Sequence, residues 1–147
     1  MFHIEKMQEP MREEVMAMVQ AFYHSDAVCH PVDRSILEQT FADAVSADPV
    51  LEGYVLMEEE RMVGFAYTTV YYACGAGGRC MMFEELFLKE ETRGKGYGTE
   101  FFRQIMDRHP EVKRFRLEVT RSNEAAVRLY ERLGFTFLAY DQMVLDR

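Results

Sequence analysis

Hydrophobic and polar residues change their spacing along the chain, and each change marks a predicted element of secondary structure. Residues 2–6 alternate as a short strand does. Beyond Pro10, apolar residues recur at spacings of three and four, which places Met11, Val15, Met18, Val19 and Phe22 on one helix face. A second helix is predicted from Asp33, a candidate N-cap, to Asp48-Pro49. Its inward face would carry Leu37, Phe41, Ala44 and Val45.

The spacing becomes extended over residues 53–88, where the pattern predicts three successive strands. Residues 59–61 and the glycine-rich segment 75–78 are the turn signals between them, so we expect adjacent antiparallel hairpins. Residues 98–109 then have helical spacing, and Pro110 stops that helix.

The last third of the chain repeats this change of period. Residues 114–119 alternate as a strand, and residues 123–133 have the spacing of a helix with Gly134 as its C-terminal cap. The tail FTFLAYDQMVLD is predicted to add one or two closing strands. The order β-α-α-β-β-β-α-β-α-β indicates an α/β (mixed α+β) fold, a mixed and mostly antiparallel sheet of about six or seven strands with about four helices on its faces.

Composition and charge narrow the class of protein. At 147 residues with 48% apolar side chains, residues 1–147 are predicted to be one domain with its own core. Without a long apolar run or a leader pattern we expect the cytoplasm and no membrane. The three cysteines lack C-x-x-C spacing, so packed thiols are expected rather than disulfides or zinc ligands. The net charge of −8 argues against nucleic acid and favours a small cation as substrate.

Candidate chemistry centres on the segment TRGKGYG at residues 92–98. It joins a predicted strand to a predicted helix, so its backbone amides would lie at the positive end of the helix dipole. Glycine leaves that backbone open, and Arg93 and Lys95 add positive charge. The segment therefore predicts a phosphate or pyrophosphate site, the alternative being a tight turn with solvated basic residues.

Two other glycine-rich phosphate motifs fit poorly. The phosphate-binding loop of nucleotide hydrolases needs Lys-Ser or Lys-Thr, which does not follow Gly98. The dinucleotide fingerprint is closer, since Gly94 and Gly96 give G-x-G and Glu118 follows at a suitable distance. However, Thr99 stands where its third glycine or alanine is required, and too few residues follow to complete that fold.

Two motifs together resemble one family. The pattern R-x-x-G-x-G is filled by Arg93, Gly96 and Gly98, and the pattern N-x-x-A-x-x-x-Y-x-x-x-G-F by Asn123, Ala126, Tyr130, Gly134 and Phe135. With the strand EELFL before them, they resemble the GNAT superfamily of acyl-CoA-dependent N-acyltransferases over roughly residues 62–138. The N-terminal half is similar only in the order of its elements.

The resemblance implies where acetyl-CoA would bind. The backbone amides from Gly94 to Thr99 would hold the pyrophosphate, a stretch that also contains Lys95, Gly96, Tyr97 and Gly98. The strand at Leu86, Phe87 and Leu88 would separate from the next strand, bind the pantetheine arm and polarise the thioester carbonyl. Asn123 and Ala126 would contact the coenzyme, although Asn123 also suits a helix N-cap. No metal is expected.

The same resemblance implies catalytic roles. Tyr130 would protonate the departing thiolate, although its position on an apolar helix stripe also suits a core tyrosine. The amine must lose a proton before it attacks, and Glu84 or Glu85 would accept it, with a slight preference for Glu84. On a regular strand the two carboxylates point to opposite faces, so only one would face substrate.

The acceptor is less defined. In this family the segment between the first two helices often shapes the acceptor pocket, so Tyr23, His24, Asp26 and Asp33 are candidate substrate contacts. The spacing of His24, Asp26, Cys29 and His30 matches no common metal site. The predicted function is direct acetyl transfer to a primary amine of a small cationic metabolite, such as a polyamine, amino acid or aminoglycoside-like compound. A protein lysine or N-terminal acetyltransferase and a non-catalytic acyl-CoA sensor are the alternatives, and a homodimer is one possible assembly.

Overall fold

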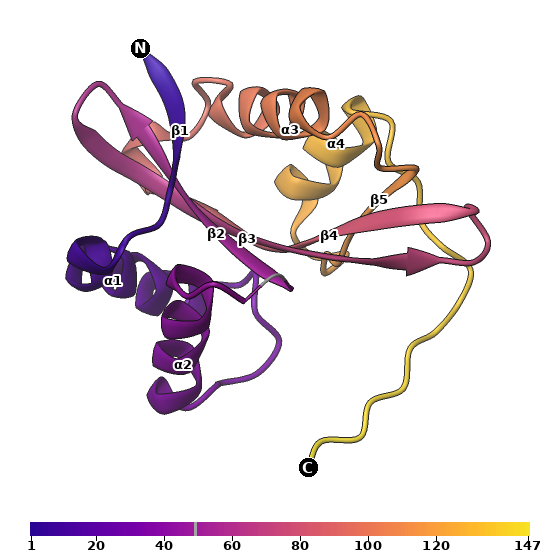
Figure 1. The fold of residues 1–147 in the computed structure, drawn as a ribbon. Coiled ribbons are helices and arrows are strands. Elements are labelled where there is room, and N and C mark those ends of the chain that lie inside the picture. Colours follow the sequence, from indigo (N-terminus) through magenta and orange to yellow (C-terminus); the bar gives the residue numbers. More distant parts are fainter. Residues whose placement is uncertain (49) are drawn as a thin grey trace.

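The computed structural model describes residues 1–48 and 50–147, and its centre is one twisted sheet (Figure 1). The sheet has the strand order β1-β2-β3-β4-β5. These strands are β1 (Phe2–Lys6), β2 (Leu51–Glu58), β3 (Arg61–Ala73), β4 (Gly78–Leu88) and β5 (Arg114–Leu117). Neighbours from β1 to β4 are antiparallel, and β5 joins β4 in parallel. The predicted antiparallel hairpins and the mixed sheet are confirmed.

Helices cover both faces of the sheet. A short 3-10 turn, η1 (Glu9–Met11), leads into α1 (Arg12–Tyr23), which lies with α2 (Arg34–Val45) on one face (Figure 1). On the other face lie α3 (Tyr97–Arg108), which follows the 3-10 turn η2 (Glu90–Thr92), and α4 (Glu124–Arg132). None of the described helices is long and apolar enough to cross a membrane.

The helix ends agree with the sequence in part. Asp33 occupies the N-cap position of α2 with an extended backbone, but its side chain makes no capping hydrogen bond. The helix ends at Val45, ahead of the predicted stop, and Pro49 lies outside the described residues. Gly134 has a φ of 97° just beyond α4, the left-handed conformation expected of a glycine after a helix.

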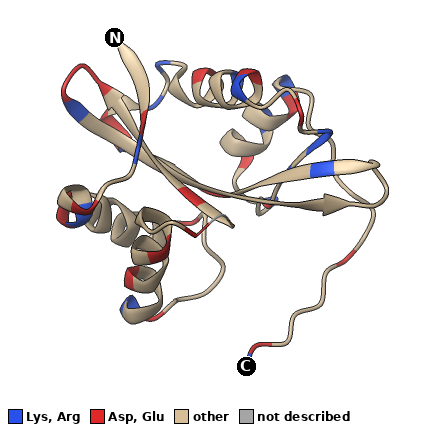
Figure 2. Ribbon diagram, viewed as in Figure 1, with Lys and Arg blue, Asp and Glu red and all other residues tan. Residues whose placement is uncertain are grey.

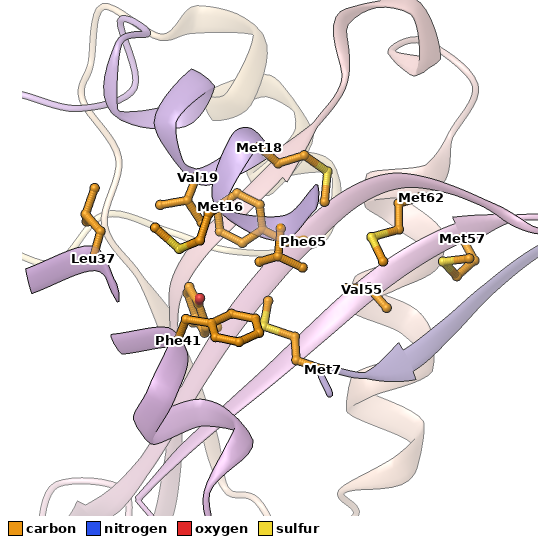
Figure 3. Close-up of a cluster of buried hydrophobic side chains, with 12 residues drawn as sticks. Met7, Met16, Met18, Val19, Leu37, Phe41, Val55, Met57, Met62 and Phe65 are labelled. Carbon is orange, nitrogen blue, oxygen red and sulfur yellow. The ribbon is translucent and has the colours of Figure 1, made fainter. Parts of the chain in front are cut away.

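Two hydrophobic clusters, one on each face, hold the layers together. Between the sheet and α1 and α2, the buried side chains include Met7, Met16, Met18, Met57 and Met62 around Phe41 and Phe65 (Figure 3). Under α3 and α4, the core is aromatic instead, with Phe83, Phe101 and Phe102 in mutual contact. Charged residues lie mainly on the outer sides of the helices and in the turns (Figure 2).

The predicted strand count is wrong. The sheet of the described residues has five strands, not six or seven, because residues 135–147 contain neither helix nor strand. The start of this tail packs against the body through Phe135, and its end projects away (Figure 1). Its alternating apolar residues suit a strand, but a strand requires a partner as well as a pattern. β5 is also shorter than predicted, since it ends at Leu117.

Candidate active site

β4 and β5, the last two strands of the sheet, separate partway along β4. Their parallel pairing runs from Cys80↔Arg114 to Phe83↔Leu117 and then stops, whereas β4 continues to Leu88. On its other edge, β4 stays paired with β3 as far as Gly64↔Leu88. The second half of β4 is therefore hydrogen-bonded on one side only.

The free backbone groups of β4 can be assigned by alternation. The Lys89 amide donates to the Val63 carbonyl at 2.8 Å, so the backbone N–H and C=O groups of Lys89 point toward β3. Because these groups alternate along a strand, those of Phe87 point toward β3 as well. Leu86 and Leu88 therefore direct their backbone groups to the open side. The Leu88 carbonyl accepts a hydrogen bond from Arg93 Nε at 3.1 Å. The N–H groups of Leu86 and Leu88 remain available to an extended ligand.

The glycine segment lies directly after this open strand. Gly94 and Gly96 have φ values of 78° and 84°, and a side chain at either position would meet no atom within 4 Å. These glycines supply left-handed backbone beside open space. Gly98 has a different role, since a Cβ there would lie 3.1 Å from Leu129 of α4, so this glycine permits close helix packing.

The amides at the start of α3 are unpaired. Among the hydrogen bonds of the described residues, none is donated by a backbone amide from Gly94 to Thr99. Gly96 is the N-cap of α3, so these amides lie at the positive end of a 12-residue helix. Unpaired amides, open space and a helix dipole together fit a pyrophosphate group.

The two basic residues of the segment have different surroundings. Lys95 Nζ lies 3.0 Å from Glu58 Oε1, and the Tyr97 hydroxyl donates to the same oxygen. Hydrogen bonds from Tyr97, Lys95 and Arg61 lower the pKa of Glu58 to about 2. These contacts tie the glycine segment to the end of β2. Arg93 is the cation without a carboxylate partner in the described part of the chain.

Tyr130 reaches the core from α4. Asn123 caps this helix by accepting a hydrogen bond from the Ala126 amide at 3.4 Å. The Tyr130 ring packs edge to face on Phe102 and Phe135, with centroid distances of 5.7 and 6.1 Å. Its hydroxyl makes no hydrogen bond to another described residue, and burial raises its pKa. The phenol is therefore protonated at neutral pH.

The two adjacent carboxylates lie at a β-bulge. Tyr67 pairs with Glu85 and Thr68 with Phe83, so Glu84 is the additional residue of β4 and has no partner across the ladder. The expectation that Glu84 and Glu85 lie on a regular strand is therefore wrong. Glu84 is the more exposed of the two, although part of its carboxyl group is desolvated, and Glu85 is the more buried.

Glu85 has the most perturbed carboxylate of the site. Its Oε1 accepts a hydrogen bond from the Tyr23 hydroxyl at the end of α1, while its Oε2 is buried without a partner in the described residues. Burial raises the pKa of Glu85 to about 7, and the Tyr23 hydrogen bond opposes that rise. A carboxylate that titrates near neutrality beside an unpaired oxygen can accept a proton.

Tyr67 is a residue that the sequence analysis missed. It lies directly across the ladder from Glu85, so both side chains are on the same face of the sheet. The Tyr67 hydroxyl is buried and also lacks a partner in the described residues. Native proteins seldom leave buried polar groups unpaired. Two such groups together indicate a place for a polar ligand, and only the register between β3 and β4 reveals them.

A third carboxylate lies near the separation of the strands. Burial and the charge of Glu118, which follows β5, both raise the pKa of Glu84. The acidic groups Glu84, Glu85 and Glu118 therefore lie close to the point where β4 and β5 part.

The other predicted substrate contacts are not gathered there. His24, Asp26 and Asp33 are exposed in and around the segment between α1 and α2. His24 Nδ1 lies 2.6 Å from the Gln20 carbonyl, so its ring contacts the end of α1. Of the candidates in this segment, Tyr23 alone bonds to a proposed catalytic residue in the described structure.

An open strand edge beside a glycine segment at a helix N-terminus is the arrangement expected from the resemblance to acyl-CoA-dependent N-acyltransferases. The model of the acetyltransferase (GNAT) family matches residues 14–135, and the chain belongs to this family. GNAT acetyltransferases use acetyl-CoA as the acetyl donor. The resemblance in the two sequence motifs is thus confirmed.

Solved structures with the same fold include acetyltransferases of different kinds. A possible acetyltransferase from Clostridium difficile 630 is similar with a TM-score of 0.79 and 15% identity, covering 99% of this chain and 97% of that one. A ribosomal-protein-alanine N-acetyltransferase from Brucella melitensis biovar Abortus 2308 has a TM-score of 0.77, 17% identity and 99% coverage of both chains.

An aminoglycoside N-acetyltransferase solved with CoA has a TM-score of 0.78 and 16% identity, covering 100% of this chain and 95% of that one. No curated protein matches the chain. At these identities the structural neighbours establish the fold and leave the acceptor open.

Proposed function

We propose that the protein transfers the acetyl group of acetyl-CoA directly to the primary amine of a small cationic metabolite, with Glu85 as general base and Tyr130 as general acid. The observation that carries this proposal is the Glu85 carboxyl group, buried, with one unpaired oxygen and a pKa of about 7. This choice reverses the slight preference of the sequence for Glu84, which is exposed.

The proposed reaction needs three proton transfers to or from the reactants. An ammonium group gives one proton to Glu85, directly or through a water molecule, and its nitrogen lone pair then attacks the thioester carbonyl. The carbon–sulfur bond breaks with its electron pair on sulfur, and Tyr130 donates its proton to that thiolate. The attacking nitrogen releases its second proton to water, and Tyr130 regains a proton from water. A phenol kept protonated by burial suits this role. The amides of Leu86 and Leu88 are candidates to polarise the carbonyl.

The acyl donor would lie along the open edge of β4. The unpaired amides from Gly94 to Thr99 would bind the pyrophosphate, with Arg93 as the nearby cation, and the free backbone groups of β4 would pair with the pantetheine arm. Lys95 is bound to Glu58, so in this proposal it positions the segment. Asn123 and Ala126 form the cap of α4 and contribute to the site by fixing that helix end.

A cationic acceptor is supported by charge. Glu84, Glu85 and Glu118 lie near the proposed reaction centre, and the net charge of the chain is −8. Carboxylates concentrate a cation near the site and repel an anion.

The proposed compartment is the cytoplasm, and residues 1–147 are proposed to form one domain.

Binding of the donor is tested by calorimetric titration of acetyl-CoA with two matched variants. Gly96→Glu places a negative side chain at the proposed pyrophosphate site, and Gly77→Glu is the control. Both glycines have positive φ, 84° and 68°, and neither side chain would meet an atom within 4 Å. The backbone penalty is therefore matched. We expect Gly96→Glu to weaken binding by about 100-fold, or about 3 kcal/mol, and Gly77→Glu to leave it unchanged.

The acceptor is tested by measuring release of the coenzyme thiol with a panel of amines. Polyamines, amino acids and aminoglycosides should support turnover, and neutral amides should not. Turnover restricted to lysine-containing or N-terminal peptides would replace the small-metabolite proposal with a protein acetyltransferase. Binding of acetyl-CoA without turnover on any amine would indicate a sensor.

A further inference from the structure

Arg116 of β5 lies on the same face of the sheet as the proposed general base. It pairs with Met82 across the ladder between β4 and β5, and Met82 pairs with Thr69 across the ladder between β3 and β4. Thr69 is two positions beyond Tyr67 on β3, and alternate residues of a strand share a face. Tyr67 and its ladder partner Glu85 face α1 and α2. Arg116 therefore points to that side of the sheet as well.

The guanidinium group of Arg116 is held in place but is not neutralised. Its Nη1 donates a hydrogen bond to the Tyr71 hydroxyl at 2.8 Å. Like Arg93, it has no carboxylate within ion-pair distance among the described residues, in a chain with a net charge of −8. The side chain is half-buried, and its remaining N–H donors are available to a planar anion.

One cavity connects Arg116 with the proposed reaction centre. The cavity has a volume of about 690 Å³, and its lining includes Arg116, Glu118 and Tyr130. This volume is in the usual range for sites that bind small molecules. Tyr130 is the proposed general acid, so the cavity includes the place where the thioester would be cleaved. A group bound to Arg116 would therefore share this cavity with the reacting atoms.

The register of the strands limits the distance between Arg116 and Glu85. Along β3, Thr69 marks the row of Arg116 and lies about 7 Å from Tyr67, which marks the row of Glu85. Tyr71, which accepts the hydrogen bond from Arg116, lies about 13 Å from Tyr67. The guanidinium group is therefore about 10 Å from the row of Glu85. Polar contacts of about 3 Å at each end leave about 4 Å for the acceptor between its two charged groups.

We propose that the acceptor is an amino acid whose ammonium group faces Glu85 and whose carboxylate binds Arg116, with about four bonds between the nitrogen and the carboxylate carbon. This inference rests on the proposed function and narrows its substrate class. A guanidinium group binds a carboxylate through two parallel hydrogen bonds, and the Tyr71 hydroxyl positions it for that contact. A diamine would place its second cation against Arg116, so the same charges disfavour a polyamine.

The acceptor class is tested by measuring release of the coenzyme thiol with γ-aminobutyrate and with its neutral amide, which has the same length. The acid should have the higher kcat/KM by about 10- to 100-fold, the usual value of one or two hydrogen bonds to a charged group. In a series from free glycine to δ-aminovalerate, kcat/KM should be highest within one carbon of γ-aminobutyrate.

The outcomes separate this inference from the proposed function. Equal kcat/KM for the acid and the amide, or an optimum at free glycine, would overturn the inference and leave acetyl transfer to amines intact. Absence of turnover with every amine would overturn both.

Arg116→Gln tests the residue itself. This variant should lose the preference for γ-aminobutyrate over its amide, and its affinity for acetyl-CoA, measured by calorimetry, should equal that of the wild type. Arg116→Lys should recover part of the preference, because it keeps the charge without the planar fork. Arg132→Gln is the matched control, because Arg132 is an exposed arginine at the end of α4, and it should keep the full preference. A preference that survives in Arg116→Gln, or weaker acetyl-CoA binding in that variant, would overturn the assignment.

Discussion

The two faces of the sheet differ in chemistry as well as in packing. The face under α1 and α2 has a methionine-rich core and carries Glu85, which is bonded to Tyr23. The face under α3 and α4 has an aromatic core and carries the glycine segment and Tyr130. β4 belongs to both faces because its side chains alternate, with Phe87 packing on one cluster and Leu86 and Leu88 on the other.

This difference suggests that the two faces of β4 contribute to different steps of the proposed reaction. Proton removal from the amine would depend on the α1 face, where a carboxyl group is desolvated. Donor binding and protonation of the leaving thiolate would depend on the α3 face, where amides and a phenol are available. Variants on the first face should therefore change acceptor kinetics and their pH dependence, and variants on the second should change events at the coenzyme.

The largest expected effect is that of Glu85→Gln. The amide cannot accept a proton, so kcat/KM for the amine should fall by about 1,000-fold, within the usual range for loss of a general base. Affinity for acetyl-CoA measured by calorimetry should not change. Glu84→Gln is the control, because Glu84 is exposed at the bulge and should lose less than about tenfold. A larger loss at Glu84 than at Glu85 would exchange their proposed roles.

Tyr130→Phe should have the next largest effect. Without the hydroxyl, the thiolate must leave unprotonated, and kcat should fall by about 100-fold. The ring contacts with Phe102 and Phe135 are retained, so acetyl-CoA should bind as before. Tyr140→Phe removes a hydroxyl from the exposed tail and should be without effect. Equal losses of coenzyme affinity and turnover in Tyr130→Phe would contradict the acid role.

The pH profile provides a finer comparison. The unprotonated form of Glu85 is the base, so kcat/KM should decline as the pH falls through about 7. The Tyr23 hydrogen bond lowers the pKa of Glu85 and the charge of Glu84 raises it. Tyr23→Phe should therefore move the acidic limb to higher pH, and Glu84→Gln to lower pH. Shifts in the same direction in both variants would be incompatible with Glu85 as the titrating group.

The same carboxyl group should also affect stability. The folded state raises the pKa of Glu85 from 4.5 to about 7, so between these pH values it holds a proton that the unfolded chain has released. The free energy of unfolding should therefore fall as pH rises across that window and level off above it. Glu85→Gln lacks this loss, and its stability relative to wild type should improve by about 3 kcal/mol between pH 4 and pH 8. Urea denaturation at both pH values measures the difference.

Local patterns were sufficient to predict most elements. The apolar spacing between Met11 and Phe22 defines α1 because one helix face must be buried, and α4 ends just before Gly134 because this glycine adopts positive φ. The glycine segment was also predictable, since left-handed backbone at Gly94 and Gly96 has few other solutions. These features depend on neighbours within a few residues, and the sequence contains them directly.

The features that rank the candidate residues depend on distant contacts. Tyr23 and Glu85 are 62 positions apart, and no local pattern indicates that one donates to the other. The bulge at Glu84 follows from the register between β3 and β4, and it distinguishes an exposed carboxylate from a buried one. The tail has the alternation of a strand, but no strand of the described residues pairs with it. Burial, strand register and strand pairing are properties of the assembled sheet, so tertiary structure decided them where the sequence offered only candidates.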